Sequence, residues 1–178
     1  MSRFTSVNPE AATGATAEVF AKIKKAAGKV PNAYATIGSH TPAGLSAMLA
    51  ADAAVAAGSL SKPDVEAIKL AVSEAGGCDY CVAAHTMVGK MVGLKPEEMK
   101  QIRAGEATGA AQRDALVRFV RKVIRSSGTV DAAEVEAIRA AGYSETQIIE
   151  ALLAVTVITF TNLVNRVNDT TVDFPAVA

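Results

Sequence analysis

The sequence has few aromatic residues, no tryptophan, almost no cysteine and no excess of charge of either sign. Aromatics make up 4% of its 178 residues, only two cysteines occur, and 18 basic residues balance 18 acidic ones. A chain without net charge gives no electrostatic reason to expect nucleic acid as a partner. Half of the residues are hydrophobic, which argues against a disordered chain, because disorder requires low hydrophobicity and high net charge.

Long apolar runs are also scarce. The uncharged stretch near the C-terminus, 151–165, has 15 residues, whereas a helix that spans a bilayer needs about 20 mostly apolar residues. The first six residues lack the basic region and apolar run of a secretory signal. We therefore expect no membrane partner and a cytoplasmic location, where structural disulfides are rare.

Alanine is the abundant residue. The chain has 36 alanines, and alanine combines the strongest helix propensity with a small volume. Apolar residues recur at helical spacing between capping and glycine signals, and no segment alternates as a strand would. We predict an all-α fold, a compact alanine-rich multi-helix bundle in a single domain over 1–178, with a loose N-terminal arm and an extended tail after position 168. Helices are expected over 15–27, 41–57, 61–75, 78–92, 95–105, 110–127, 131–141 and 144–167. The helix order in 60–104 resembles that in 129–167, which suggests a duplicated helical motif.

Both cysteines and one of the two histidines fall within the eight positions 78–85. On an ideal helix Cys78, Cys81 and His85 lie within a wedge of about 60°, and Cys81 and His85 are four residues apart, so their side chains can touch. The glycines at 76 and 77 place Cys78 in the first helical turn, where free N–H groups and the helix dipole favour a thiolate. The Cys-x-x-Cys spacing also permits a disulfide across one turn. These features predict a redox dithiol, in which one thiolate attacks and the other cysteine closes the disulfide.

An acidic residue on the preceding helix is a candidate partner for this cluster. Glu66 would approach Cys81 or His85 if the two helices pack antiparallel, and a carboxylate there could orient the imidazole and pass protons. Glu74 is closer in sequence but lies near the turn, where it is more easily solvated. Spacing alone does not decide between them.

Other functions fit the same residues. Cys78, Cys81, His85 and Glu66 could together supply the four ligands of a structural zinc site in a non-catalytic helical oligomer. The dithiol could instead serve a protein disulfide reductase or a redox sensor. Two buried, inert cysteines are the third alternative.

The pattern of a Glu, eleven residues and then Cys-x-x-Cys-x-x-x-His, carried here by Glu66, Cys78, Cys81 and His85, resembles the alkylhydroperoxidase D-like group of the carboxymuconolactone decarboxylase family. Further resemblance lies at 30–32 and 140–144. It implies an all-helical homo-oligomer, commonly a trimer or hexamer, that reduces hydroperoxides without a bound cofactor or metal. It also implies roles: Cys81 as the peroxidatic thiolate, Cys78 as the resolving cysteine, and Glu66 with His85 as the proton relay.

The resemblance further implies an external dithiol reductant, because the best-known members are re-reduced through a lipoyl-bearing protein. Those members carry a second histidine between the cysteines, where this chain has Tyr80. A phenol does not titrate near neutrality, so the relay is expected to be shorter here. The founding decarboxylases lack the cysteine pair, which disfavours a lactone decarboxylase. From sequence we therefore expect a thiol-dependent hydroperoxide reductase.

Overall fold

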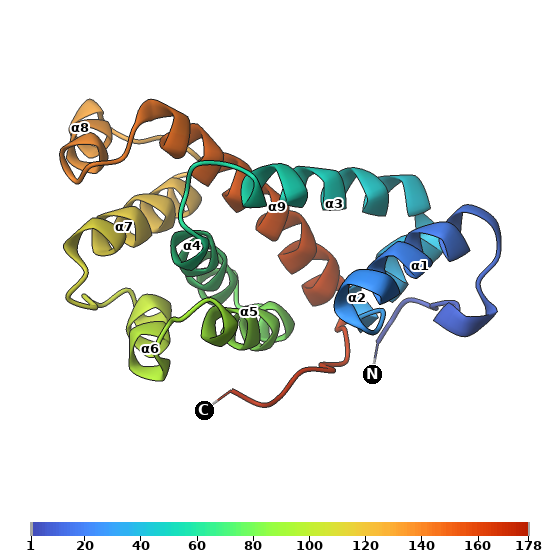
Figure 1. Cartoon of the computed structure of the whole chain (residues 1–178). Helices are drawn as coiled ribbons and strands as arrows, with labels where there is room; N and C mark the ends of the chain where they lie inside the picture. Colours follow the sequence, from blue (N-terminus) through green and yellow to red (C-terminus); the bar gives the residue numbers. More distant parts are fainter. Residues whose placement is uncertain (1, 178) are drawn as a thin grey trace.

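The computed structural model describes residues 2–177; Met1 and Ala178, the two ends of the predicted domain, lie outside the described residues. Over this range the chain forms α-helices joined by short connections, and it has no strand (Figure 1). The all-α prediction is confirmed. The elements are η1 (Pro9–Ala11), α1 (Gly14–Ala27), α2 (Asn32–His40), α3 (Pro42–Ala56), α4 (Lys62–Ala75), α5 (Asp79–Met91), α6 (Pro96–Ala104), α7 (Ala111–Arg125), α8 (Ala132–Ala140) and α9 (Glu145–Asn168).

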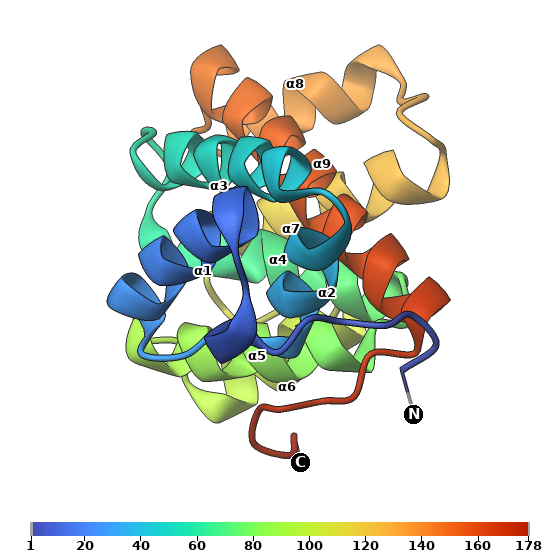
Figure 2. The same cartoon turned by 90° about the vertical axis from the view of Figure 1, so that its right-hand side faces the viewer.

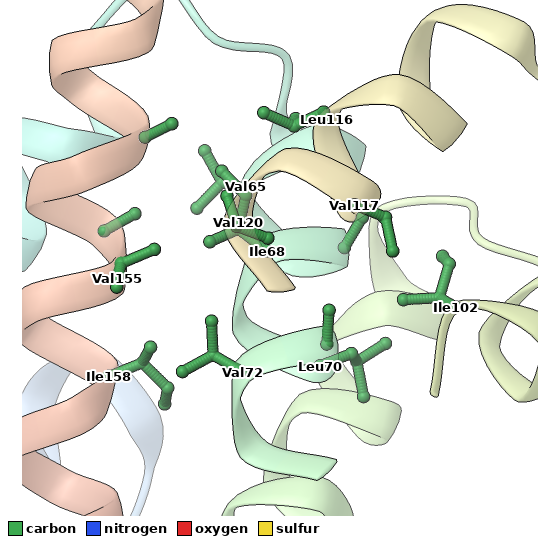
Figure 3. Packing of buried hydrophobic residues seen from close by; sticks show 14 of the residues in the cluster. Val65, Ile68, Leu70, Val72, Ile102, Leu116, Val117, Val120, Val155 and Ile158 are labelled. Atoms are coloured by element: carbon green, nitrogen blue, oxygen red, sulfur yellow. The ribbon is translucent and has the colours of Figure 1, made fainter. Parts of the chain in front are cut away.

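Helix α4 forms the centre of the bundle. It begins where the Ser61 hydroxyl accepts the Asp64 N–H, and every residue over 65–73 is buried. Helices α5, α6, α7 and α9 all pack against it. Figure 3 shows its buried side chains filling the space between α9 on one side and α6 and α7 on the other. A helix enclosed on so many sides can hold a polar side chain away from solvent.

Helix α9 is the longest helix of the described chain. A capping box starts it, as the sequence predicts: Ser144 Oγ accepts the Gln147 N–H, and the Gln147 side chain accepts the Ser144 N–H. It is long and apolar enough to cross a membrane, with a mean hydropathy of 1.7 over its best window. It packs instead against α2, α3, α4, α5 and α7 and buries Asn162, Asn165 and Asn168. These contacts are those of a core helix in a bundle.

One helix was not expected from the sequence. The sequence predicts no helix between 27 and 41, yet α2 begins directly after Pro31 and runs to His40. Its apolar positions form no regular stripe, because most of its residues are buried among α1, α3 and α9. Gly38 belongs to this packing, since a Cβ there would collide with the Phe20 ring. Tertiary packing, rather than a local pattern, forms α2.

The start of the described chain lies against the end of α9 (Figure 2). In the N-terminal arm, the Arg3 N–H donates to the Asn168 carbonyl oxygen at 2.7 Å, and the Phe4 N–H donates to Asn168 Oδ1 at 2.7 Å. The C-terminal tail leaves α9 at Asp169, whose φ of +52° is left-handed, and contains no helix. The tail crosses back to the start of α2, where Asp173 accepts from Lys29 Nζ at 2.8 Å.

The central position of α4 predicts a strong dependence of stability on its apolar side chains. Ile68 is fully buried, so Ile68→Ala should lower the free energy of unfolding by about 2–5 kcal/mol in chemical denaturation. Met91 is 77% exposed, and Met91→Ala should change it by no more than about 0.5 kcal/mol. Equal losses for the two variants would contradict the placement of α4 at the core.

Candidate functional site

The turn between α4 and α5 sets the position of the first cysteine. Gly76 ends α4 and Gly77 adopts a φ of +63°, a left-handed conformation that favours glycine. Cys78 follows as the N-cap of α5, which begins at Asp79, so Cys78 lies just before the first helical turn rather than within it. Its sulfur accepts the Cys81 N–H at 3.3 Å. The cysteine sulfur thus replaces the usual oxygen cap of a helix.

The two sulfurs lie 2.7 Å apart, and both cysteines are free thiols with 3% or less of their surface exposed. The hydrogen bond between the two thiols, reinforced by donation from the Cys81 N–H, lowers the pKa of Cys78 even though burial opposes this. The same bond, together with burial, raises the pKa of Cys81. Of the two thiols, Cys78 is therefore the easier to ionise.

The antiparallel packing of α4 and α5 brings Glu66 to His85. Glu66 Oε2 and His85 Nδ1 are 2.8 Å apart, and the two side chains are 7% and 17% exposed. An ionised carboxylate only accepts hydrogen bonds, so Nδ1 carries the proton and donates. The other ring nitrogen, Nε2, is then free to exchange protons in the neutral imidazole.

Burial raises the pKa of Glu66, but attraction to His85 and to Lys69 outweighs it, and the pKa lies below its ordinary value. Lys69 Nζ is 3.7 Å from Glu66 Oε1 and bonds to Asp52 Oδ1 at 2.7 Å. Glu66 is therefore ionised at neutral pH. Glu74, the alternative acid from the sequence, forms an ion pair with Arg103 instead. Glu66, rather than Glu74, lies at the cluster.

The sulfurs lie between two different pockets. Cys81 lines a mainly apolar pocket of about 210 Å³, together with Tyr34, His85 and Met87; we call this the Cys81 pocket. Cys78 lines a more polar pocket of about 270 Å³, the Cys78 pocket, whose charged residues are Asp79, Arg166 and Asp169. Tyr80 and Asn165 contribute to both. Each cysteine thus lines a pocket of its own.

Tyr80 holds the tail against the site. Its hydroxyl donates to Asp173 Oδ1 at 2.7 Å and accepts the Ala33 N–H at 3.1 Å. The Phe174 ring meets the Tyr80 ring edge to face, at 5.4 Å between centroids, and lines the Cys81 pocket. Burial, together with nearby negative charge, raises the pKa of Tyr80. The Tyr80 hydroxyl thus joins the tail to the start of α2.

Sequence reasoning missed three residues of the site. Asn165 donates from Nδ2 to Cys81 Sγ at 3.3 Å. The asparagines at 162, 165 and 168 interrupt an apolar segment, but their spacing indicates no particular chemistry. Tyr34 lines the Cys81 pocket, and burial with nearby Asp52 raises its pKa to about 12. Phe174 comes from the tail, whose path the sequence does not indicate.

The alternative of a metal site receives no support from the side-chain arrangement. Within residues 2–177, no three His, Cys, Asp or Glu side chains are grouped as metal ligands would be. The Glu66 carboxylate and the His85 Nδ1, two of the four suggested ligands, bond to each other. The four predicted residues thus form two hydrogen-bonded pairs, the dithiol and the acid–imidazole pair.

Comparisons with known proteins agree with this architecture. Residues 41–122 match the model of the carboxymuconolactone decarboxylase family. A peroxidase-related protein of Ralstonia eutropha, described as an alkylhydroperoxidase core, is 25% identical with a TM-score of 0.86, covering 97% of this chain and 92% of that one. A peroxidase-related protein of a Silicibacter species is 22% identical with a TM-score of 0.76 over 94% and 91% of the two chains.

A third similar structure has a different activity. The debrominase Bmp8, solved in complex with 2,3,4-tribromopyrrole, is 18% identical with a TM-score of 0.79 over 97% of this chain and 94% of that one. No curated protein has a sequence that matches this chain. The resemblance inferred from sequence is confirmed, and the known proteins of this fold differ in function.

The lowered pKa of Glu66 predicts a pH dependence of stability. Its stabilising effect is complete above the ordinary carboxyl pKa of 4.5 and is lost as pH falls through the lower folded value. Between about pH 7 and pH 3 the parent should therefore lose more unfolding free energy than Glu66→Gln. Denaturant titrations at several pH values measure this difference, and parallel curves for the two proteins would contradict it.

Proposed function

Since residues 41–122 match the model of the carboxymuconolactone decarboxylase family and the fold is that of alkylhydroperoxidase-like proteins, we propose that the protein is a thiol-dependent peroxidase. It reduces organic hydroperoxides through a Cys78–Cys81 dithiol–disulfide cycle. The observation that carries this proposal is the pair of sulfurs 2.7 Å apart beside the buried Glu66–His85 pair. Such an arrangement provides a nucleophile, a resolving thiol and a proton carrier in one place.

In the first step Cys81 attacks. His85, oriented by Glu66, takes the proton from the Cys81 thiol, and the thiolate attacks the distal oxygen of the hydroperoxide. The S–O bond forms, the O–O bond breaks, and His85 returns the proton to the departing alkoxide, giving an alcohol and a sulfenic acid. Cys81, not Cys78, is assigned this role because it shares its pocket with His85. The lowered pKa of Cys78 does not conflict with this role, since two thiols in contact titrate as a pair.

In the second step Cys78 attacks the Cys81 sulfur. The S–S bond forms, and the sulfenic OH group departs as water with the proton of the Cys78 thiol. An external dithiol then attacks the disulfide, restores both thiols and is itself oxidised. The Cys78 pocket would give this reductant an approach separate from the Cys81 pocket. In some members of this family the reductant is a lipoyl-bearing protein, and we propose a dithiol of that class here.

The pockets also bear on substrate class. The Cys81 pocket is mainly apolar and about 210 Å³ in volume, which suits the organic part of an alkyl hydroperoxide. Both sulfurs are buried, so an extended peptide carrying a disulfide would have to displace the surrounding helices. This geometry favours a small hydroperoxide over a protein disulfide as the oxidant. We propose a cytoplasmic location, where external dithiols are available.

An exposed apolar stripe supports the proposed homo-oligomer. Along α9 the exposed apolar side chains, together with Thr156, recur every three or four residues. On an ideal helix these positions fall within an arc of about 80°. Such spacing is typical of a seam between packed helices. The stripe comprises Ile149 (66% exposed), Leu153 (37%), Phe160 (39%), Leu163 (60%) and Val167 (55%).

The proposed cycle predicts different results for the two cysteines. After one equivalent of cumene hydroperoxide, Cys81→Ser should show no rapid reaction. Cys78→Ser should react and retain one added oxygen at Cys81, visible by mass spectrometry, because no second thiol can remove it. Rapid oxidation of Cys81→Ser would contradict the assignment of the attacking sulfur.

Glu66→Gln tests the proton relay in the same assay. The loss of a positioned acid–base pair lowers rates by about 10² or more, so the variant should react at least that much more slowly and with a changed pH–rate profile. Glu74→Gln, which alters the other acid of α4, is the matched control and should behave as the parent. An unchanged profile for Glu66→Gln would show that the carboxylate has no part in the relay.

If the stripe forms the interface, a charged side chain introduced into it should dissociate the oligomer. Leu163→Glu should have a lower mass by light scattering than the parent, approaching the monomer mass of 18.3 kDa. Met91→Glu, at a more exposed position outside the stripe, should leave the mass unchanged. A monomeric parent, or an oligomer insensitive to Leu163→Glu, would rule out this interface.

A further inference from the structure

One buried side chain at the sulfurs has an unsatisfied hydrogen-bonding atom. Asn165 is 4% exposed, and its Nδ2 donates to Cys81 Sγ at 3.3 Å. Its Oδ1 has no hydrogen-bond partner within the described residues. Leaving a buried acceptor unpaired costs about 1–3 kcal/mol, so the unpaired Asn165 Oδ1 requires an explanation.

The other two buried asparagines of α9 use both of their side-chain polar atoms, so the unpaired acceptor occurs only at the one that contacts the dithiol. Asn162 Oδ1 accepts from Ser73 Oγ at 3.2 Å, and its Nδ2 donates to the Val72 carbonyl oxygen at 3.5 Å. Asn168 is likewise bonded through both of its side-chain atoms. Of these three buried amides, the one that contacts the dithiol is the one with an unused acceptor.

Asn165 lies at a point where such an acceptor can meet a substrate. Its side chain lines the Cys81 pocket and the Cys78 pocket, and thus forms part of the boundary between them. A hydroperoxide has a single O–H, on the oxygen that the thiolate attacks. A molecule placed against Cys81 Sγ therefore presents its only donor close to the amide that already holds this sulfur.

We propose that Asn165 is a catalytic residue, which donates from Nδ2 to the Cys81 sulfur and accepts the O–H of the bound hydroperoxide at Oδ1. This inference rests on the proposed peroxidase function. It accounts for both ends of the amide, and it distinguishes a hydroperoxide from a dialkyl peroxide, which has no O–H to donate.

The amide would act throughout the oxidation of Cys81. When the thiolate attacks, the distal oxygen passes to sulfur with its hydrogen still attached, and the alkoxide leaves with the proton from His85. Sulfur is oxidised by two electrons and the O–O bond is reduced. The same hydrogen then belongs to the sulfenic acid, and Oδ1 continues to accept it. The bond would hold the sulfenic oxygen on the side of Asn165 while Cys78 attacks the Cys81 sulfur.

The test compares Asn165→Leu with Asn162→Leu, which removes an equally buried amide from the same helix without touching the sulfurs. Pre-steady-state oxidation by cumene hydroperoxide should slow by about 10²-fold in Asn165→Leu, the usual effect of losing a positioned polar group in a reaction centre. Asn162→Leu should lower stability but keep the parent rate. Equal rates for the parent and Asn165→Leu would overturn the proposal.

A second measurement does not depend on peroxide. In a Cys78→Ser background, the pH dependence of Cys81 alkylation by iodoacetamide should shift to higher pH when Asn165 is replaced by Leu, because the thiolate loses a donor. Asn165→Asp, which keeps the shape, should shift it further through its charge, and this variant serves if the Leu variant fails to fold. An unshifted alkylation profile for both variants would refute the donor role. A parent that fails to react with hydroperoxide would refute the peroxidase function and the acceptor role, while the alkylation profile still decides the donor role.

Discussion

The hydrogen bond between Glu66 and His85 is the interaction on which the site depends. A carboxylate enclosed by packed helices is costly unless cations and donors surround it, and here His85 and Lys69 provide them. The bond forms because the Gly76–Gly77 turn sends α5 back along α4, so that residues 19 positions apart face each other. The same turn leaves Cys78 at the N-cap of α5. One change of chain direction therefore positions the acid, the imidazole and the dithiol together.

The surroundings of the two sulfurs are unequal, and this inequality gives the site a direction. Cys78 accepts from the Cys81 N–H, bonds to the Cys81 thiol, and lines a pocket with charged side chains. Cys81 opens toward an apolar pocket that includes His85. The oxidant and the reductant can thus reach the same pair from different sides. In this account α9 contributes chemistry as well as packing, because its residue Asn165 touches the sulfur that is proposed to react.

Local patterns were sufficient to predict most helices and the four residues of the cluster. The capping box at Ser144 and the glycines after α4 mark boundaries that the structure confirms, and the Cys-x-x-Cys-x-x-x-His spacing places its members on one helix. The choice of Glu66 over Glu74 required the packing of α4 against α5. Helix α2 was missed because its stability comes from burial. Asn165 and Phe174 were missed for a similar reason, since each reaches the site from a distant part of the chain, and no sequence spacing records such a contact.

The most direct test is a count of thiols in the parent protein before and after one equivalent of an alkyl hydroperoxide, with peptide mapping to locate any disulfide. The account predicts two thiols before and none after, a Cys78–Cys81 disulfide, and recovery of both thiols with a dithiol. Two thiols that persist in the presence of the hydroperoxide, while the protein stays folded, would contradict it.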